Sequence, residues 1–282
     1  MSNITTLKQN ISESDSLKLV IDALGEVATM KLKATRKSIQ QNTVFFDEIG
    51  AVYRAVQIMA EKRRLLLHEA SPKNGRNISL LITSNAAFHG GLDSELTSYF
   101  IQAVGKYSTD IVVIGRSGEK YLRALGFTHP YQTIIFDGDF PKTQEILDLT
   151  SNIKDYSKIL VYHSKFVTVL DQQVEVSDLS ATAEGDNKDA PQINYLIEPE
   201  LPKMLSFFEG QILSSLLESV FLESELAKTA ARMVSMDTAG LHAEKILDQE
   251  KQVLLRARKN LQNIRILETF VQIKNIVKED YV

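Results

Sequence analysis

The stretch 203–240, KMLSFFEGQILSSLLESVFLESELAKTAARMVSMDTAG, opens 80 residues that contain no proline. Residues 1–71 also lack proline, and all six prolines lie between residues 72 and 202 with nine of the thirteen glycines. Proline and glycine are the residues least compatible with a helix interior. Both ends of the chain are therefore predicted to be long helices. A helix of about 60 residues extends roughly 90 Å, so we expect the two helices to pair with each other as an antiparallel coiled coil.

Apolar residues in both ends recur at the three- and four-residue spacing of a coiled-coil seam. Near the start, the spacing is carried by Leu17, Ile21, Leu24 and Ala28, and then by Phe45, Ile49, Val52, Val56 and Met59. Near the end, it is carried by Phe208, Ile212, Leu216 and Val220, and then by Leu254, Ala257, Leu261 and Ile264. The stripe drifts from a strict heptad, which predicts two wound helices rather than an idealised zipper.

The middle of the chain alternates short apolar runs with helical segments. Strands are expected at 77–84, 110–115, 132–136 and 158–162, helices at 93–106, 117–125 and 141–153, and an antiparallel edge hairpin at 167–179. Residues 181–192 are polar and acidic, as in a surface loop. Such alternation predicts a mostly parallel sheet with helices on its faces. The fold class is thus a small Rossmann-like α/β domain (71–200) inserted between two coiled-coil helices (1–70 and 201–282).

Composition excludes several classes of function. The net charge of −4 argues against general nucleic-acid binding, and the acidity belongs to residues 71–200, which carry 11 basic and 17 acidic residues. The chain has no cysteine, which excludes disulfide and thiolate chemistry. No apolar run approaches the roughly 20 residues that span a bilayer. Membrane association is therefore expected only through partners.

Candidate catalytic, cofactor and metal sites are weak. The segment SNAAFHGG at 84–91 follows a strand and precedes a helix, where phosphate-binding loops lie, but it lacks the glycine spacing and lysine of nucleotide loops. No two of the five histidines have the spacing of metal ligands. We expect no catalytic residue, no cofactor and no metal.

Two basic groups mark the terminal helices. Lys31, Lys33, Arg36 and Lys37 form the first, and Arg256, Arg258 and Lys259 form the second. These basic side chains either lie on a solvated helix surface or make electrostatic contacts with an acidic ring of protein around the paired helices.

Short motifs along nearly the whole chain resemble the gamma subunit of F-type rotary ATP synthases. They are Val27-Ala28 with Lys31-Leu32-Lys33, similar to V-A-x-x-K-M-[RK]; ITSNAAFHGGL at 82–92, similar to S-D-R-G-L-C-G-x; the glycine turn at 113–118; Lys165-Phe166; YLIEP at 195–199; and ARMVSM at 231–236. Their order and spacing are more specific than any one of them.

The resemblance implies a non-catalytic central rotor. Three alpha and three beta subunits would form a ring around the coiled coil, and an epsilon-type subunit and the c-ring would contact the α/β domain. The contacts that transmit rotation would include Met30, Lys31, Lys33, Arg232, Met233, Arg256 and Arg258. The complex would lie on the cytoplasmic face of a bacterial plasma membrane and reach the membrane only through partners.

The chain also departs from the family pattern. Ala87 stands at a motif glycine, His89 at its cysteine, and Lys228 at a position that is usually glutamate. The family's C-terminal R-Q-A-x-I-T-x-E pattern is reduced to Arg258, which Lys259 follows. Three alternatives stay open: a gamma-like rotor of a specialised ATPase not used for synthesis, an unrelated coiled-coil scaffold, and a phosphate-binding α/β enzyme.

Overall fold

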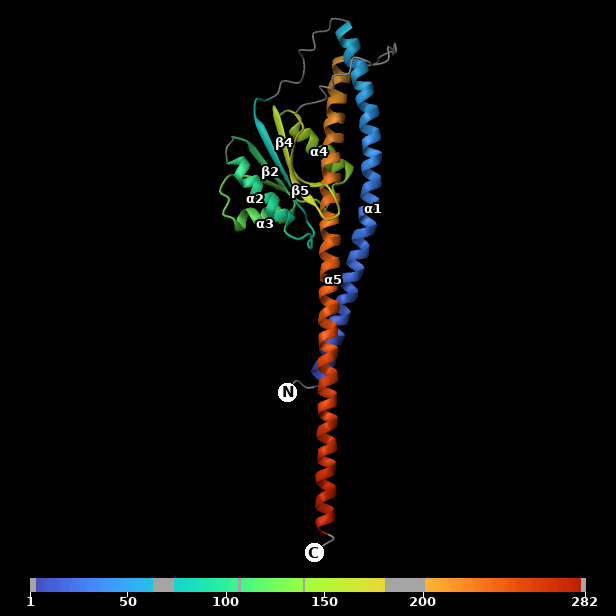
Figure 1. Cartoon of the computed structure of the whole chain (residues 1–282). Coiled ribbons are helices and arrows are strands. Elements are labelled where there is room, and N and C mark those ends of the chain that lie inside the picture. The colour runs from blue at the N-terminus through green and yellow to red at the C-terminus, as the bar shows by residue number, and fades with distance from the viewer. Residues whose placement is uncertain (1–3, 63–73, 106–107, 139, 181–200, 280–282) are drawn as a thin grey trace. The chain divides into compact units, whose positions relative to one another are not determined.

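Two long helices begin and end the chain in a computed structural model, as Figure 1 shows. The structure describes residues 4–62, 74–105, 108–138, 140–180 and 201–279. Helix α1 spans Ile4–Lys62 and helix α5 spans Leu201–Glu279. The chain divides into two compact units, one formed by Met1–Val27 with Ser235–Val282 and the other by Ala28–Val234. In each unit α1 packs along α5, which confirms the prediction that the ends pair.

The second unit contains a five-stranded sheet in the order β3-β2-β1-β4-β5. Its elements are β1 (Asn77–Ile82), α2 (Leu92–Val104), β2 (Asp110–Ile114), α3 (Arg116–Ala124), β3 (Gln132–Ile134), α4 (Thr143–Ile153), β4 (Lys158–Phe166) and β5 (Gln172–Asp178). Strands β1 to β4 are parallel, and β5 is antiparallel to β4. The predicted mostly parallel α/β domain is therefore confirmed.

The edge hairpin differs from the prediction, which placed both of its arms within 167–179. Strand β4 instead runs on to Phe166, and β5 pairs with it from Phe166↔Gln172 to Leu160↔Asp178. The reversal is a short turn in which the Val167 amide donates to the Asp171 carbonyl at 3.2 Å. The apolar run ends at Tyr162, but His163 and Ser164 continue the strand as fully buried polar residues. A prediction based on apolar residues therefore ends the strand too early.

The sheet is covered on both faces, which gives three layers. Alternate residues of the strands pack on one side against α4 and α5, with Leu217 of α5 fully buried. The others pack on the opposite side against α2 and α3, where Leu96 and Phe100 are fully buried. Burying one such side chain stabilises the fold by about 1.5–3 kcal/mol. Helix α5 is therefore part of the α/β core as well as the partner of α1.

The buried seam of α1 is more regular than the apolar residues suggested. Its least exposed side chains follow one unbroken alternation of three- and four-residue steps from Leu7 to Val56. The members are Leu7, Ile11, Ser14, Lys18, Ile21, Gly25, Ala28, Leu32, Thr35, Ile39, Asn42, Phe46, Ile49, Tyr53 and Val56. The prediction was right at Ile21, Ala28, Ile49 and Val56. It was wrong at Leu17, Leu24, Phe45 and Val52, which are exposed, and Met59 lies outside the side chains that the structure describes.

Polar residues within this seam contact α5. In the second unit, the Asn42 amide donates to the Ser215 carbonyl at 3.3 Å, and the Ser215 hydroxyl donates back to Asn42 Oδ1 at 3.2 Å. A buried polar pair of this kind costs stability but fixes the register of two helices. Sequence patterns that reward only apolar residues cannot identify such positions.

In the first unit the two helices run antiparallel and close together. Lys18 lies 3.8 Å from Glu244, and a Cβ atom added at Gly240 would lie 3.4 Å from Asp22. In this register Ile4 lies opposite residue 258. Consistent with that limit, Leu254 is buried while Leu261 and Ile264 are 39% and 42% exposed. The predicted seam therefore ends near residue 257.

Candidate functional site

The junction between the paired helices and the α/β domain lies at the middle of α5. Eight consecutive residues, 224–231, are all buried, whereas a helix on a protein surface buries only one stripe. Leu226 and Ala230 pack against Leu32 of α1, while Ala227 packs with Leu92 of α2. Helix α5 is thus enclosed by the other helix of the coil and by the domain at once.

An ion pair crosses the coil at this junction. Lys31 of α1 contacts Glu225 of α5, whose side chain is only 3% exposed. The Thr229 hydroxyl donates a second hydrogen bond to Glu225 Oε1 at 3.3 Å. A carboxylate buried this deeply requires a cationic partner, because removing either half of a buried pair is strongly destabilising. Lys31 therefore fixes α1 against α5.

A second charged group lies between α2 and α5. His89 Nε2 lies 2.8 Å from Asp93 Oδ2, which also accepts a hydrogen bond from the Ser84 amide at 3.0 Å. Burial raises the pKa of Asp93, but the His89 hydrogen bond and the charge of Lys228 outweigh it, so that the pKa of Asp93 is lowered overall. Lys228 is 1% exposed. The charges of α2 and α5 thus compensate one another inside the junction.

Backbone amides of the 84–91 segment, which could otherwise bind an anion, donate to side chains of the same chain. The buried Asp93 carboxylate accepts the Ser84 amide, and the Ala86 amide donates to Ser84 Oγ at 3.1 Å. Asp93 and Glu95 also fill the first turn of α2, where acidic side chains satisfy the helix dipole and repel an incoming anion. The segment is therefore a structural turn rather than a phosphate-binding loop.

The same segment ties three strand ends together. Asn85 accepts the Arg116 amide at 3.0 Å and donates to the carbonyls of Phe136 and Gly138 at 3.0 and 2.8 Å. Arg232 of α5 donates from Nε to the Ala87 carbonyl at 3.1 Å. These bonds attach the carboxyl edge of the sheet to α5.

The turn after β2 requires glycine at position 115 because of its backbone conformation and its close contact with β1. The φ of Gly115 is +100°, and an added Cβ atom would lie 2.6 Å from the Thr83 carbonyl oxygen. The Thr83 hydroxyl in turn donates to the Ile114 carbonyl at 2.7 Å. Only glycine allows β1 and β2 to approach this closely before α3 begins.

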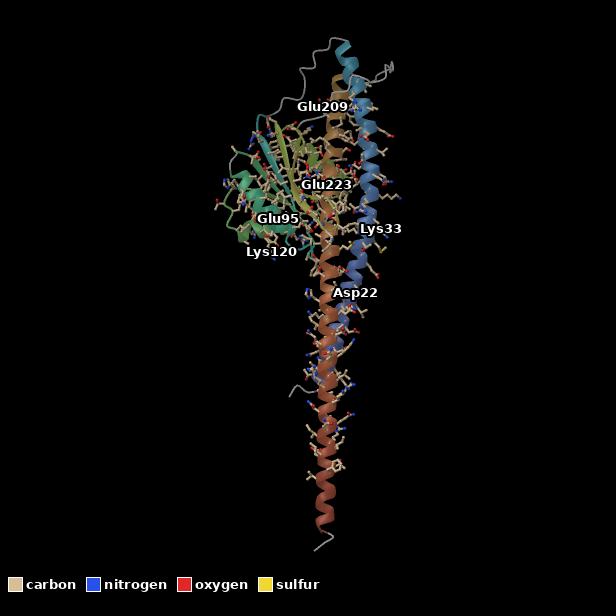
Figure 2. The ribbon with its side chains drawn as sticks, in the orientation of Figure 1. Asp22, Lys33, Glu95, Lys120, Glu209 and Glu223 are labelled. Carbon is tan, nitrogen blue, oxygen red and sulfur yellow. The ribbon has the colours of Figure 1, made fainter. Side chains whose placement is uncertain are left out.

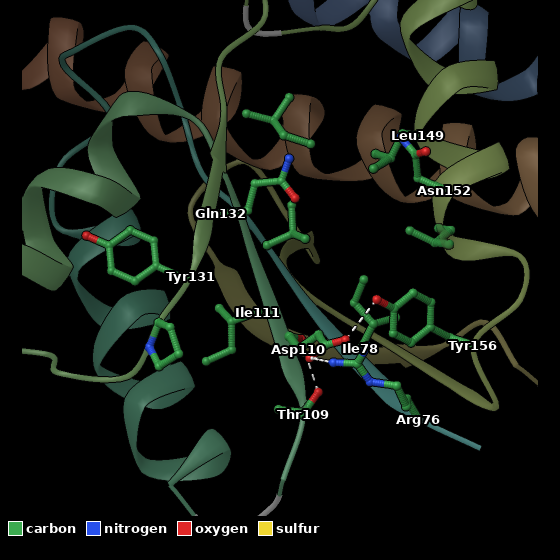
Figure 3. Close-up of a pocket in the computed structure, with 14 residues that line it drawn as sticks. Arg76, Ile78, Thr109, Asp110, Ile111, Tyr131, Gln132, Leu149, Asn152 and Tyr156 are labelled. Atoms are coloured by element: carbon green, nitrogen blue, oxygen red, sulfur yellow. Dashed lines mark hydrogen bonds and ion pairs between the residues drawn. The ribbon is translucent and has the colours of Figure 1, made fainter. Parts of the chain in front are cut away.

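A groove of about 610 Å³ lies at the opposite, amino edge of the sheet (Figure 3). Arg76 and Asp110 form an ion pair at 2.6 Å within it, and the Tyr156 hydroxyl donates to Asp110 at 2.8 Å. The charges in this part of the groove are mutually compensated. Ligands of open α/β sheets bind instead at the carboxyl ends of the strands. The groove therefore gives no support to the enzyme alternative.

Comparison with known proteins separates the rotor interpretation from the unrelated scaffold and the enzyme. The family model described as ATP synthase matches residues 3–261. The ATP synthase gamma chain of Clostridium beijerinckii is 23% identical over 265 residues, which cover 91% of this chain and 92% of that one. The chain belongs to the ATP synthase gamma chain family. That of Clostridium kluyveri is 21% identical over 258 residues, covering 88% and 89%, so this chain is a divergent gamma subunit of the central stalk and is itself non-catalytic.

Solved structures support the gamma-chain fold. A chain of the central stalk and c-ring structure of Tetrahymena thermophila mitochondrial ATP synthase superposes with a TM-score of 0.58 at 16% identity, covering 78% of this chain and 99% of that one. A chain of the Euglena gracilis mitochondrial ATP synthase structure gives 0.56 at 15% identity, covering 93% and 97%. Among the described residues, no helix of this gamma subunit is long and apolar enough to cross a membrane.

The residues expected to transmit rotation in a gamma subunit have different surroundings. Met30 is 71% exposed and Lys33 is also exposed on α1, whereas the neighbouring Lys31 turns inward to Glu225. Figure 2 labels Lys33 on α1. On α5, Arg232 bonds the Ala87 carbonyl and Met233 is half-buried. In the other unit, Arg256 and Arg258 are exposed.

Sequence reasoning missed an apolar stripe on the outside of α1. Leu17, Val20, Leu24 and Val27 recur at three- and four-residue steps and are 58%, 55%, 36% and 59% exposed. The sequence pattern places two of them, Leu17 and Leu24, in the buried seam. The buried stripe can be told from the exposed one by its regular three- and four-residue spacing along all of α1, which passes through Lys18, Ile21 and Gly25. Only some residues of that buried stripe are apolar. Contiguous apolar surface of this kind is uncommon on soluble proteins.

Proposed function

We propose that the coiled coil of this gamma subunit turns inside a ring of three alpha and three beta ATPase subunits. The outward stripe of α1 in the first unit carries this proposal, because isolated soluble proteins rarely expose a continuous apolar surface. The exposed apolar residues of α5, including Leu255 at 55% and Leu267 at 64%, extend it. An apolar collar would cover this surface without forming fixed ion pairs that resist rotation.

Transmission requires that the shaft contact each beta subunit differently. A shaft can shift a site only by the difference of its contact free energy between the states of that site. Met30, Lys33, Arg256 and Arg258 are exposed, and we assign them to direct contact with the ring.

The remaining three candidates act inside the chain. Lys31 pairs with Glu225, Arg232 holds the Ala87 carbonyl, and Met233 is half-buried beside it in sequence. We propose that these residues hold the paired helices and the α/β domain together, so that torque is transmitted between them.

The α/β domain is the attachment point in this proposal. Segments 1–70 and 201–282 form the shaft, and 71–200 binds an epsilon-type subunit and the c-ring. The gamma-chain relatives named above are bacterial, which supports a place on the cytoplasmic face of a bacterial plasma membrane, with the membrane reached only through these partners.

Co-expression with the alpha and beta subunits of the same organism tests the proposal. We expect one copy of the chain to co-purify with three copies of each. Leu24→Glu combined with Val27→Glu should reduce recovery, because it places charge on the outward stripe. Leu170→Glu, at a residue 83% exposed on the β4–β5 turn, is the control and should leave recovery unchanged. Purification of the chain without ATPase subunits would contradict the proposal.

A further inference from the structure

A group of potential metal ligands lies outside the junction. His163 of β4, Glu175 of β5 and Glu223 of α5 each offer one ligand atom, and these atoms all lie within 4.8 Å of one another. His163 and Glu175 are directly paired across the ladder, so their side chains share one face of the sheet. Glu223, which Figure 2 labels, belongs to α5. Three elements distant in sequence therefore converge on one point.

The hydrogen bonds of His163 leave one nitrogen suited to a metal. Nδ1 lies 3.3 Å from the Ser164 carbonyl, and Nε2 lies 2.9 Å from the Ser177 hydroxyl. A carbonyl can only accept, so the proton belongs on Nδ1 and the lone pair on Nε2. A backbone carbonyl fixes the tautomer of many metal-binding histidines in this way. The Ser177 hydroxyl can rotate when a metal takes the lone pair.

Burial keeps the imidazole neutral, as metal ligation requires. The side chain of His163 is fully buried, and burial lowers its pKa to about 4. Glu223 is half-buried, and burial together with the charge of Glu175 raises its pKa. Two carboxylates that repel each other beside a neutral imidazole would gain from a divalent cation between them.

Two lysines lie near the group and compete with a cation. Lys165 pairs with Glu175 at 2.6 Å, and its side chain is 44% exposed, so it can move into solvent. Lys228 acts on His163 electrostatically but also on Asp93, on the α2 side. Binding therefore requires Lys165 to release Glu175, which is a distinctive and testable cost.

We propose that His163, Glu175 and Glu223 bind a divalent ion of the zinc class. One imidazole and two carboxylates are a ligand set that zinc accepts, with a fourth position left to water. Zinc–ligand distances of about 2.0–2.2 Å require the three side chains to close slightly from their present spacing. The ion would fasten the β4–β5 hairpin to α5.

The experiment is zinc titration of the full chain, purified without a histidine tag and stripped of metal. Calorimetry and metal analysis should give one zinc per chain, and cobalt in its place should give the visible spectrum of a four-coordinate site. Glu223→Gln should weaken binding about tenfold or more. Lys165→Met should tighten binding several-fold, because it removes the competitor for Glu175.

Glu218→Gln is the matched control. Glu218 is a partly buried glutamate of the same helix whose pKa burial also raises, but it is not among the three ligands, so its replacement should leave zinc affinity unchanged. Both test positions, Glu223 and Lys165, retain surface exposure, and circular dichroism will show that these variants fold. Failure to bind zinc stoichiometrically, or equal affinity of Glu223→Gln and the unmodified chain, would overturn the proposal.

Discussion

Replacing Lys31 by methionine should destabilise the second unit, because it leaves Glu225 buried without its cation. The Glu225 side chain is 3% exposed and that of Lys31 is 39% exposed. Breaking a buried pair costs about 3–5 kcal/mol. Because Lys31 is partly solvated, its contribution is screened, and we expect a loss smaller than that range, about 2–3 kcal/mol.

Thermal unfolding followed by circular dichroism measures this loss. For a domain of this size, about 2–3 kcal/mol lowers the midpoint by roughly 4–12 °C. Lys33→Met is the matched control, since Lys33 is exposed on the same helix and should change stability by less than about 0.5 kcal/mol.

A double-mutant cycle separates the pair from the rest of the junction. Combining Lys31→Met with Glu225→Gln should recover much of the loss, because the uncompensated charge is gone. If Lys31→Met and Lys33→Met shift the midpoint equally, the ion pair does not hold the two helices together and the reasoning is refuted.

Three further predictions concern the junction and the sheet. Because the pKa of Asp93 is lowered in the folded chain, its carboxylate contributes stability above pH 3.8, the pKa of the unfolded chain, and this stability is lost as pH falls through the folded pKa. The free energy of unfolding should therefore fall less steeply with acid in Asp93→Asn than in the exposed-site control Asp155→Asn. Gly115→Ala should cost about 3 kcal/mol in urea unfolding, since it combines a positive φ with a clash, whereas Gly138→Ala should be nearly neutral. Lys228→Glu, which restores the residue usual in the family, should destabilise this chain by placing a second carboxylate near Asp93, and a more stable Lys228→Glu variant would show that their charges do not compensate.

The sequence was sufficient for the architecture because proline and glycine placement and strand–helix alternation act locally. It was insufficient for the seam, where Lys18, Gly25 and Asn42 occupy buried positions while Leu17 and Leu24 face outward. The partner helix determines which stripe of α1 is buried, whereas a prediction from the sequence pattern selects the stripe with more apolar residues. The prediction was also wrong at Leu261, which is exposed and lies beyond the α5 residue opposite Ile4, the first described residue of α1.

The candidate site shows the same limit. The motif around Lys31 and the Arg232 segment were visible in the sequence, but their internal partners Glu225 and Ala87 were not. The ligands His163, Glu175 and Glu223 are brought together by strand register and by the passage of α5. No rule of ligand spacing along the chain could have found them.

Rotation of this chain within an immobilised ring of alpha and beta subunits tests the central claim most directly. A probe attached to the α/β domain, for example at exposed Leu125, would report its angle during ATP hydrolysis in single complexes. If the paired helices are the shaft, the probe should turn in one direction, with three pauses per revolution, one for each beta subunit. A complex that hydrolyses ATP at full rate while the probe stays at a fixed angle would contradict the assignment of this chain as the rotor.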